Sequence, residues 1–190
     1  MAAVRLKITL RGVRPPVWRR VVVPASFTLA ELHSVLQTAM GWTDSHLHSF
    51  DVGGVLYGDV EELEGKVGNE TRTRLSSVAR RVSKFRYEYD FGDAWEHDVL
   101  IEDVQPDAAA AEPFCTAGRR ACPPEDCGGP WGYEHLLEVL ADPEHEEHAH
   151  LSEWIGGPFD PQEFDVAETN DQLRGIDHAG AGRPGGPGVA

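Results

Sequence analysis

The strongest structural signal in the sequence is a helix over residues 28–41. Thr28 and Glu31 have the T-x-x-E spacing of a capping box, in which each side chain satisfies a backbone N–H group of the other. Gly41 is suited to end the helix, because glycine adopts a left-handed backbone at little cost. The apolar positions recur at helical spacing and form one stripe: Leu29, Leu32, Leu36, Ala39 and Met40. A helix with one apolar face needs a second layer, which the flanking segments must supply.

Those flanking segments have the period-two alternation of half-buried strands. Residues 4–13 alternate apolar with basic or polar side chains, and residues 17–23 are rich in β-branched residues up to Pro24. Beyond the helix, we expect a strand over 46–52 with a hairpin through Gly53–Gly54, and a second hairpin made by 84–91 and 95–104. Phe85, Tyr87, Tyr89 and Phe91 would share one face of that hairpin. Residues 58–73 are expected to form a loop, and 106–113 a connector.

The C-terminal third predicts helices. Apolar spacing favours a short helix ending near Asp142–Pro143, a second over 144–155, and a last one near 165–174. The second would bury Leu151, Trp154 and Ile155 at its end. The sequence therefore predicts an α+β fold with a mixed or antiparallel sheet, an early ββαββ segment of β-grasp-like order and C-terminal helices. We expect one domain over residues 1–178 and a flexible Gly/Pro tail over 179–190.

Charge is distributed unevenly along the chain. The net charge is −15, but residues 1–86 contain 13 Lys/Arg and 8 Asp/Glu, whereas residues 87–190 contain 4 Lys/Arg and 24 Asp/Glu. One interpretation is that the two halves attract each other within one fold. The alternative is a restricted basic patch for nucleic acid, built from the arginines of the first half, although an acidic protein is a poor non-specific binder of phosphates. The arginines and lysine concerned are Arg11, Arg14, Arg19, Arg20, Arg72, Arg74, Arg80, Arg81, Lys84 and Arg86.

No signal peptide or membrane segment is expected. No apolar run reaches the roughly 18 residues that a spanning helix needs, and Arg5 and Lys7 interrupt the N-terminal apolar residues. A cytoplasmic location is the expectation that follows.

Three cysteines lie close together around the loop of residues 119–133. Cys122 and Cys127 form a C-x₄-C pair, and Cys115 precedes them by seven residues. Thiolates at such spacing can bind zinc if a fourth ligand, such as a histidine, comes from elsewhere. The alternative is that these thiols pack as small apolar groups beneath a loop stiffened by proline and glycine. An odd number of cysteines argues against a disulfide framework, and C-x₄-C is not the C-x-x-C arrangement of redox pairs.

A second candidate site combines histidines and carboxylates. His46 and His48 would lie on the same strand face, and Asp93 and His97 belong to the nearby segment YDFGDAWEHD. Imidazole and carboxylate together can bind a metal ion or transfer protons. The alternatives are that Asp90 and Asp93 are ordinary turn residues and that the histidines only line a polar sheet face. HEEHAH at 145–150 reads as a solvated acidic helix face, since the HExxH pattern is absent.

Four ordered segments resemble the plasmid pRiA4b ORF-3-like family. They are LKITLRGVRPPVWRRVVVP, TLAELHSVLQTAMGWTDSHLHSF, YEYDFGDAWEHDV and CTAGRRACPPEDCGGPWGYEHLLEVLADPEHEEH. The resemblance spans about residues 4–174 and implies an α+β fold and an association with plasmids and insertion elements. The resemblance implies no enzymatic activity. Such proteins are sometimes labelled TnpR, or resolvase-like, but this sequence has no serine nucleophile in a recombinase context.

Three functions compete at this point. The leading hypothesis is a non-enzymatic binding or accessory module for a protein partner or a small ligand. The second is a metal-dependent enzyme, with zinc as one candidate ion, that uses His46, His48, Asp93 and His97, with or without Cys115, Cys122 and Cys127. The third is a nucleic-acid accessory protein that uses the arginines.

Overall fold

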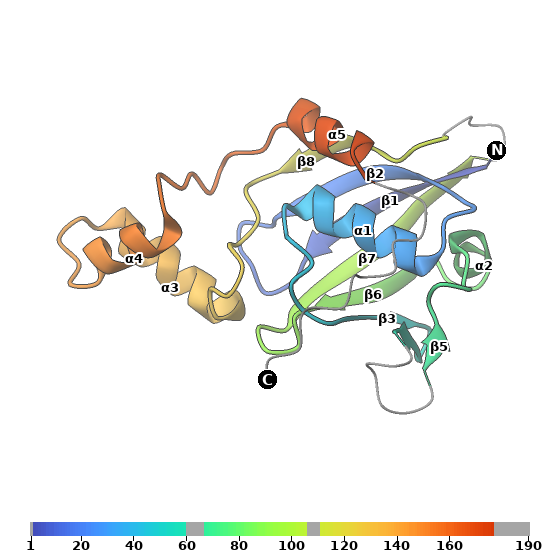
Figure 1. Ribbon diagram of the computed structural model, residues 1–190, viewed down its shortest axis with the longest axis horizontal. Helices are drawn as coiled ribbons and strands as arrows, with labels where there is room; N and C mark the ends of the chain where they lie inside the picture. Colours follow the sequence, from blue (N-terminus) through green and yellow to red (C-terminus); the bar gives the residue numbers. More distant parts are fainter. Residues whose placement is uncertain (1, 60–66, 106–110, 177–190) are drawn as a thin grey trace, which may run out of the picture.

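A single eight-stranded sheet organises the computed structural model, which describes residues 2–59, 67–105 and 111–176 (Figure 1). The strand order is β5-β4-β3-β6-β7-β1-β2-β8, and every neighbouring pair is antiparallel except β4 and β5. The strands are β1 (Ala3–Leu10), β2 (Trp18–Pro24), β3 (His48–Val52), β4 (Val55–Gly58), β5 (Gly68–Asn69), β6 (Lys84–Tyr89), β7 (Trp95–Gln105) and β8 (Phe114–Arg119).

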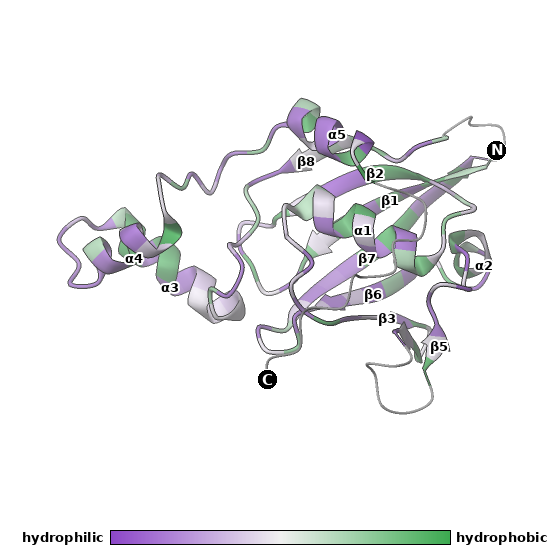
Figure 2. Ribbon diagram, in the orientation of Figure 1, coloured by the Kyte–Doolittle hydropathy of each residue, from purple (hydrophilic) through white to green (hydrophobic). Residues whose placement is uncertain are grey.

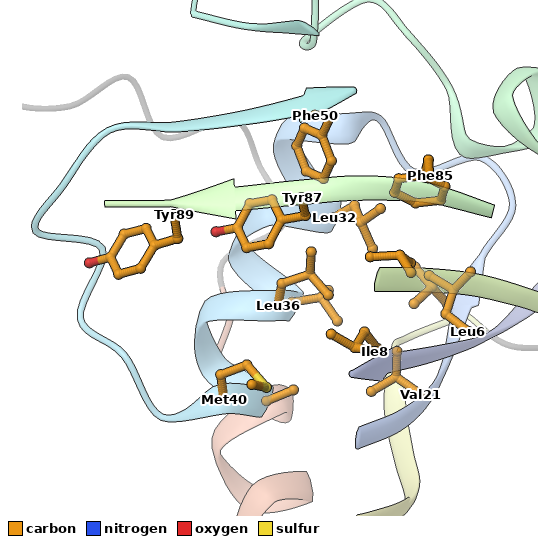
Figure 3. Packing of buried hydrophobic residues seen from close by; sticks show 14 of the residues in the cluster. Leu6, Ile8, Val21, Leu32, Leu36, Met40, Phe50, Phe85, Tyr87 and Tyr89 are labelled. Carbon is orange, nitrogen blue, oxygen red and sulfur yellow. The ribbon is translucent and has the colours of Figure 1, made fainter. Parts of the chain in front are cut away.

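Helix α1 (Leu29–Met40) packs its apolar stripe on one face of this sheet. The predicted capping box forms: the Thr28 hydroxyl accepts from the Glu31 N–H at 3.2 Å, and Glu31 accepts from the Thr28 N–H at 2.7 Å. Gly41 ends the helix with φ 95°. Figure 3 shows the resulting core, in which side chains of α1 meet those of β1, β2, β3 and β6. The core residues labelled there are Leu6, Ile8, Val21, Leu32, Leu36, Met40, Phe50, Phe85, Tyr87 and Tyr89.

Four further helices surround the sheet or extend from it. They are α2 (Leu75–Ala79), α3 (Gly129–Ala141), α4 (His148–Ile155) and α5 (Val166–Arg174). Helix α5 packs along β8 and α1, whereas α3 and α4 pair with each other and project away from the sheet (Figure 1). The predicted buried end of α4 is only partly confirmed: Leu151 and Ile155 are partly buried and pack against the hydrophobic core, whereas Trp154 is 45% exposed. Helix α4 pairs with α3 and contributes no fully buried residue of its own.

Ion pairs cross the sheet face opposite α1 and connect the two halves of the chain. Arg11 pairs with Glu96 at 3.0 Å, and Arg20 with Glu102 at 2.7 Å. Lys84 and Arg86 pair with carboxylates of the same strand β7. Because β7 lies between β6 and β1, its row of carboxylates faces basic residues on both sides. Part of the basic first half is therefore neutralised within the fold, as the first interpretation of the charge asymmetry expects.

The α+β class is confirmed, and several local expectations need correction. The ββαββ order exists, but the β6–β7 hairpin lies between the β1–β2 and β3–β4 hairpins. The loop expected over 58–73 contains β5, and α2 and β8 had no recognised signal. Phe91 is 41% exposed because β6 ends at Tyr89. Residues 179–190, the expected tail, lie outside the described residues.

The hydropathy of the residues matches their positions in the helix and sheet layers. Figure 2 shows hydrophobic and hydrophilic residues alternating along α1, as expected for a helix with one buried face. No described helix is both long enough and apolar enough to cross a membrane.

Candidate functional site

Three loops meet at one end of the sheet. They are residues 42–47 between α1 and β3, the turn between β6 and β7, and the cysteine loop before α3, which begins beside that turn (Figure 1). The Trp42 indole N–H donates to the Pro123 carbonyl at 2.9 Å, and the Gly128 N–H donates to Asp93 Oδ2 at 3.0 Å. Position 129 requires glycine for two reasons. A Cβ atom there would collide with the Asp93 carbonyl, and the backbone φ of Gly129 is 69°, which side-chain-bearing residues rarely adopt. These contacts fix the cysteine loop against the other two segments.

Glu125 is the central tie between these loops. One of its oxygens accepts from the Thr43 N–H at 2.8 Å and from the Tyr89 hydroxyl at 3.1 Å. The Tyr89 hydroxyl itself accepts from the Ser45 N–H at 3.0 Å. Burial raises the pKa of Tyr89, so its hydroxyl stays protonated and can act as the donor that Glu125 requires.

His46, Asp90 and Asp126 supply one side chain from each loop. His46 Nε2 lies 3.0 Å from Asp126 Oδ1 and 3.7 Å from Asp90 Oδ2. Despite this proximity, His46 Nε2 is a buried atom without a hydrogen-bond partner among the described residues, because its direction suits neither carboxylate as a hydrogen bond. The other oxygen of Asp90 accepts from the Gly92 N–H at 2.9 Å, which leaves Oδ2 facing His46. A nitrogen and two carboxylate oxygens thus converge without bonding to one another.

The spacing of these three atoms fits a shared metal ion. Ligand bonds of about 2.1 Å place neighbouring donors about 3.0 Å apart in an octahedron and about 3.4 Å apart in a tetrahedron, with about 4.2 Å between opposite donors. The two distances from His46 Nε2, 3.0 Å and 3.7 Å, lie inside that range, and all three ligand atoms lie within 4.8 Å of one another. The exposure of Asp126, whose side chain is 70% accessible, provides an entry path.

Both carboxylates of this group occupy unusual backbone positions. Asp90 has φ 55° and Asp126 has φ 56°, in the left-handed region that residues other than glycine rarely adopt. Such conformations cost on the order of 1–3 kcal/mol each and concentrate at functional sites, where the surrounding structure holds them. The fold therefore accepts backbone strain at the two residues that direct carboxylates toward His46.

A second histidine–carboxylate group lies deeper, between α1 and the sheet. His33 Nε2 lies 2.7 Å from Asp44 Oδ1, and His48 Nε2 lies 2.9 Å from Glu70 Oε2. The two imidazole rings stack at 3.5 Å between centroids and are nearly parallel. The ligand atoms of His33, Asp44 and His48 also lie within 4.8 Å of one another.

The directions of the hydrogen bonds determine which atoms carry the protons in this second group. The Asp44 N–H can only donate, so its 3.0 Å partner on Gln37 is the side-chain oxygen, and the Gln37 amide N–H₂ donates to the Tyr87 hydroxyl at 2.8 Å. The Tyr87 proton is then directed to His33 Nδ1 at 2.8 Å. Burial raises the pKa of Tyr87 and lowers that of His33, so both groups are neutral at pH 7. His33 therefore carries its proton on Nε2 and donates it to Asp44.

This proton chain makes the second group a poor metal site. An ion on His33 Nε2 would move the ring proton to Nδ1, where the Tyr87 oxygen would have to accept it. The Tyr87 proton would then lose its acceptor inside the core, at a cost of about 1–3 kcal/mol. His33, Gln37 and Tyr87 are better described as a satisfied polar network that links α1 to β6. The convergent group at His46 has no such competing bonds.

The structure separates the four residues of the predicted histidine site. His46 joins Asp90 and Asp126, while His48 bonds Glu70. Asp93 accepts from the Gly128 N–H and supports the cysteine loop. His97 is fully buried in the core, with its Nδ1–H directed at the Tyr87 carbonyl. Among the described residues these four do not gather around one point, because His46 precedes β3 and does not share the strand alternation of His48.

The three cysteines are free thiols. Cys115 is buried on β8, and its Sγ–H donates to the Ala117 carbonyl at 3.4 Å. Cys122 and Cys127 are partly buried against the core. Burial raises the pKa of all three thiols. Within residues 2–59, 67–105 and 111–176, no cysteine belongs to a group of three convergent metal ligands. The packing interpretation thus accounts for their positions, and zinc binding by these thiols stays a prediction without support from the geometry.

Sequence reasoning missed two of the three convergent ligands. Asp90 is a turn residue, as the turn alternative expects, since one of its oxygens accepts turn N–H groups. Asp126 lies in the cysteine loop, within PPEDCGG, where the neighbouring cysteines are the more obvious candidate metal ligands. The available signal was the pair of adjacent carboxylates, Glu125 and Asp126, directly after a diproline that stiffens the loop.

Fold and site together define a class of protein: a single-sheet α+β protein with a histidine–carboxylate group where three loops meet. Residues 2–168 match the family model described as plasmid pRiA4b ORF-3-like protein, and the chain belongs to this family. The uncharacterized protein y4hQ of Sinorhizobium fredii (strain NBRC 101917 / NGR234) is 46% identical over 172 residues, covering 89% of this chain and 87% of that protein. A crystal structure of a protein of unknown function, MM3350 from Methanosarcina mazei Go1, superimposes with a TM-score of 0.78 at 40% identity. That match covers 88% of this chain and 97% of the solved chain. The relatives are thus of unknown function, and nothing in the comparisons indicates an enzymatic activity.

Proposed function

We propose that the protein is a binding module that holds a divalent transition-metal ion between His46, Asp90 and Asp126. The observation that carries the proposal is the buried His46 Nε2, which has no hydrogen-bond partner among the described residues and faces two carboxylates at 3.0 Å and 3.7 Å. The nitrogen and the two anionic oxygens converge without a hydrogen bond between them, and a cation at their centre would contact all three. A divalent ion balances both charges.

Charge around the group supports a cation. Glu125 and Asp126 are adjacent, and Asp90 reaches the same site from the β6–β7 turn. No Lys or Arg side chain forms an ion pair with any of these three carboxylates in the part of the chain that the structure describes. One imidazole with carboxylates suits ions such as Mn²⁺, Fe²⁺ and Zn²⁺ more than Mg²⁺, which prefers oxygen ligands alone.

The role of the ion is to join three segments of the fold. Each ligand comes from a different loop, so binding would stabilise the loop arrangement that Glu125 and Asp93 already hold by hydrogen bonds. Three protein ligands leave coordination positions for water or for a small ligand. The module is proposed as non-enzymatic because its ligands join loops of the fold. A catalytic metal would also use open positions, so turnover of a substrate there is the outcome that would favour the metal-dependent enzyme.

Titration of metal-free protein with Mn²⁺ and Zn²⁺ by calorimetry tests the proposal. We expect one ion per chain, and at least tenfold weaker binding in Asp126→Asn, because one anionic ligand is lost. Asp103→Asn removes the same charge from an exposed position on β7 and should leave affinity unchanged. Circular dichroism checks that the variants fold.

Two results would refute the metal site. One is the absence of stoichiometric binding by the native chain, and the other is equal affinity of Asp126→Asn and Asp103→Asn. A single ion retained by Asp126→Asn but lost in Cys122→Ser would instead assign it to the cysteines.

Location and biological context belong to the same proposal. We place the protein in the cytoplasm, supported by three free cysteines, which are typical of a reducing compartment. Membership of the plasmid pRiA4b ORF-3-like family supports an accessory role on plasmids or mobile elements.

A further inference from the structure

Four exposed arginines surround the short helix α2. Two precede the helix and two follow it: Arg72, Arg74, Arg80 and Arg81. Because α2 has only five residues, or about 7.5 Å of helix, these four charges stay close together. Within residues 2–59, 67–105 and 111–176 none of them forms an ion pair, and their side-chain hydrogen bonds run to uncharged oxygens of Ser26, Ser77 and Tyr57. We call these four residues the α2 arginines.

An apolar border adjoins the α2 arginines on β4. Arg81 donates to the Tyr57 hydroxyl at 2.8 Å, which joins the end of α2 to that strand. Val55 and Leu56 precede Tyr57 on β4 and are 39% and 48% exposed. Arginine is enriched at protein interfaces, and exposed aliphatic side chains beside it add apolar area that a partner can bury.

Helices α3 and α4 carry the opposite charge at the other end of the molecule. Residues 129–155 contain seven Asp/Glu and no Lys or Arg, and all seven acidic residues are exposed. We call residues 129–155 the acidic arm. Figure 1 shows the acidic arm projecting from the sheet at one end of the long axis, whereas α2 lies toward the other end. The acidic arm of a chain is therefore remote from the α2 arginines of the same chain, and only another molecule can bring such charges together.

Two tryptophans make the acidic arm complementary to arginine. Trp131 at the start of α3 is 83% exposed, and Trp154 on α4 is 45% exposed. On α3, Trp131, Glu134 and Glu138 recur at helical spacing, so an exposed indole and two exposed carboxylates share one face. A guanidinium stacks on an indole ring and pairs with carboxylates through its planar N–H groups. The two surfaces thus match in charge and in chemistry.

We propose that the acidic arm of one chain docks on the α2 arginines of a second copy. Every chain carries both halves of this contact, so the complementary partner is present wherever the protein is. The contact is head-to-tail, and its repetition gives a ring or a chain of copies. Although each copy has a net charge of −15, repulsion between copies is screened over about 8 Å at physiological salt, whereas the docked charges are in contact. The proposed metal ligands take no part in this contact.

Sedimentation velocity over a range of protein concentrations tests the proposal, with EDTA present so that metal binding cannot contribute. We expect reversible association at an ionic strength of about 0.15 M, and roughly tenfold weaker association at about 1 M, where screening is much stronger. The α2 variant, Arg72→Glu with Arg80→Glu, should lose this association. Its control, Arg14→Glu with Arg119→Glu, changes the net charge equally at exposed positions away from α2 and should keep it.

A charge exchange separates docking from effects on folding or net charge. The arm variant, Glu144→Lys with Glu146→Lys, should associate as weakly as the α2 variant when each is alone. In a mixture the α2 variant supplies a native arm and the arm variant supplies native arginines, so a 1:1 dimer should form. The net charges are −19 for the α2 variant, which is −15 minus four, and −11 for the arm variant, which is −15 plus four. Overall attraction between the two variants therefore does not account for such a dimer.

Several outcomes would overturn the proposal. They are a native chain that stays monomeric, association that strengthens at high salt, association that persists in the α2 variant, and a mixture that stays monomeric. An oligonucleotide bound through Arg72 and Arg80 by a native chain that does not self-associate would also overturn it and assign the α2 arginines to nucleic acid. If one variant does not fold, the salt dependence of the native chain and the other variant decide the question. Because EDTA is present throughout, a negative result leaves the metal proposal untouched.

Discussion

His97 makes the stability of the protein depend on pH in a way that can be calculated. The imidazole is fully buried on β7, with the Trp42 ring edge-on at 5.3 Å and the Tyr87 ring at 5.2 Å. Its Nδ1–H donates to the Tyr87 carbonyl at 3.3 Å, and Nε2 is enclosed without a partner among the described residues. A second proton would have to enter this apolar space, so burial lowers the pKa of His97 from 6.5 to about 4.

The sign of the effect follows from where the proton binds. Between pH 6.5 and 4 the unfolded chain protonates His97 while the native protein does not, so the free energy of unfolding falls as the pH falls. A pKa difference of about 2.5 corresponds to roughly 3.4 kcal/mol at full effect below pH 4. Between pH 7 and pH 5, about 2 kcal/mol of stability should be lost through this one group.

Urea denaturation of the native chain and of His97→Gln at pH 7 and pH 5 measures this contribution. His97→Gln will be less stable at both pH values, but its decrease between them should be smaller than that of the native chain by about 2 kcal/mol. His150→Gln, at an exposed position on α4, is the control and should match the native pH dependence. Equal decreases in the native chain and His97→Gln would refute the assignment, because His97 would then titrate normally in the folded state.

Two substitutions test how local structure is held, each by urea denaturation. Thr28→Ala removes the hydroxyl that accepts from the Glu31 N–H and should cost about 1 kcal/mol, so an unchanged midpoint would contradict the role of the capping box. Gly132→Ala would drive a Cβ into the Cys127 carbonyl at the start of α3 and should cost more than 1 kcal/mol. Gly157→Ala meets no atom within 4 Å and should stay within about 0.5 kcal/mol of the native protein, which makes it the matched control.

The elements that the sequence predicts well are those with strong local signals. Helix α1 has a capping box, an apolar stripe and a terminal glycine, and the structure has all three features. The β6–β7 hairpin follows from alternating aromatic residues and a tight turn. In contrast, β5 has two residues and α2 has five, so neither spans enough positions to establish a period. β8 forms because β2 presents a free edge to it, which is a tertiary cause that a single segment does not reveal.

The candidate site was only partly visible in the sequence because its ligands are distant along the chain. His46, Asp90 and Asp126 are separated by 44 and 36 residues, and each stands in a loop where no periodicity applies. The sequence correctly drew attention to His46 and to the β6–β7 turn. It also paired His46 with His48 by strand alternation, although β3 begins only at His48. Convergence of loops depends on strand order, and that order places the β6–β7 hairpin between segments that are contiguous in the predicted ββαββ unit.

The distribution of charge now has a structural explanation that bears on the choice between functions. Carboxylates of β7 engage Arg11, Arg20, Lys84 and Arg86, so these four residues are not free to contact a nucleic-acid backbone. The remaining acidic residues are concentrated in and around α3, α4 and α5, where they would repel phosphates. A phosphate-binding surface that used these four residues would therefore have to break internal ion pairs and approach an acidic molecule at once. A cation between His46, Asp90 and Asp126 faces neither obstacle, because the local charge is already negative there. This asymmetry is why the charge pattern favours a metal-binding module over a nucleic-acid accessory protein.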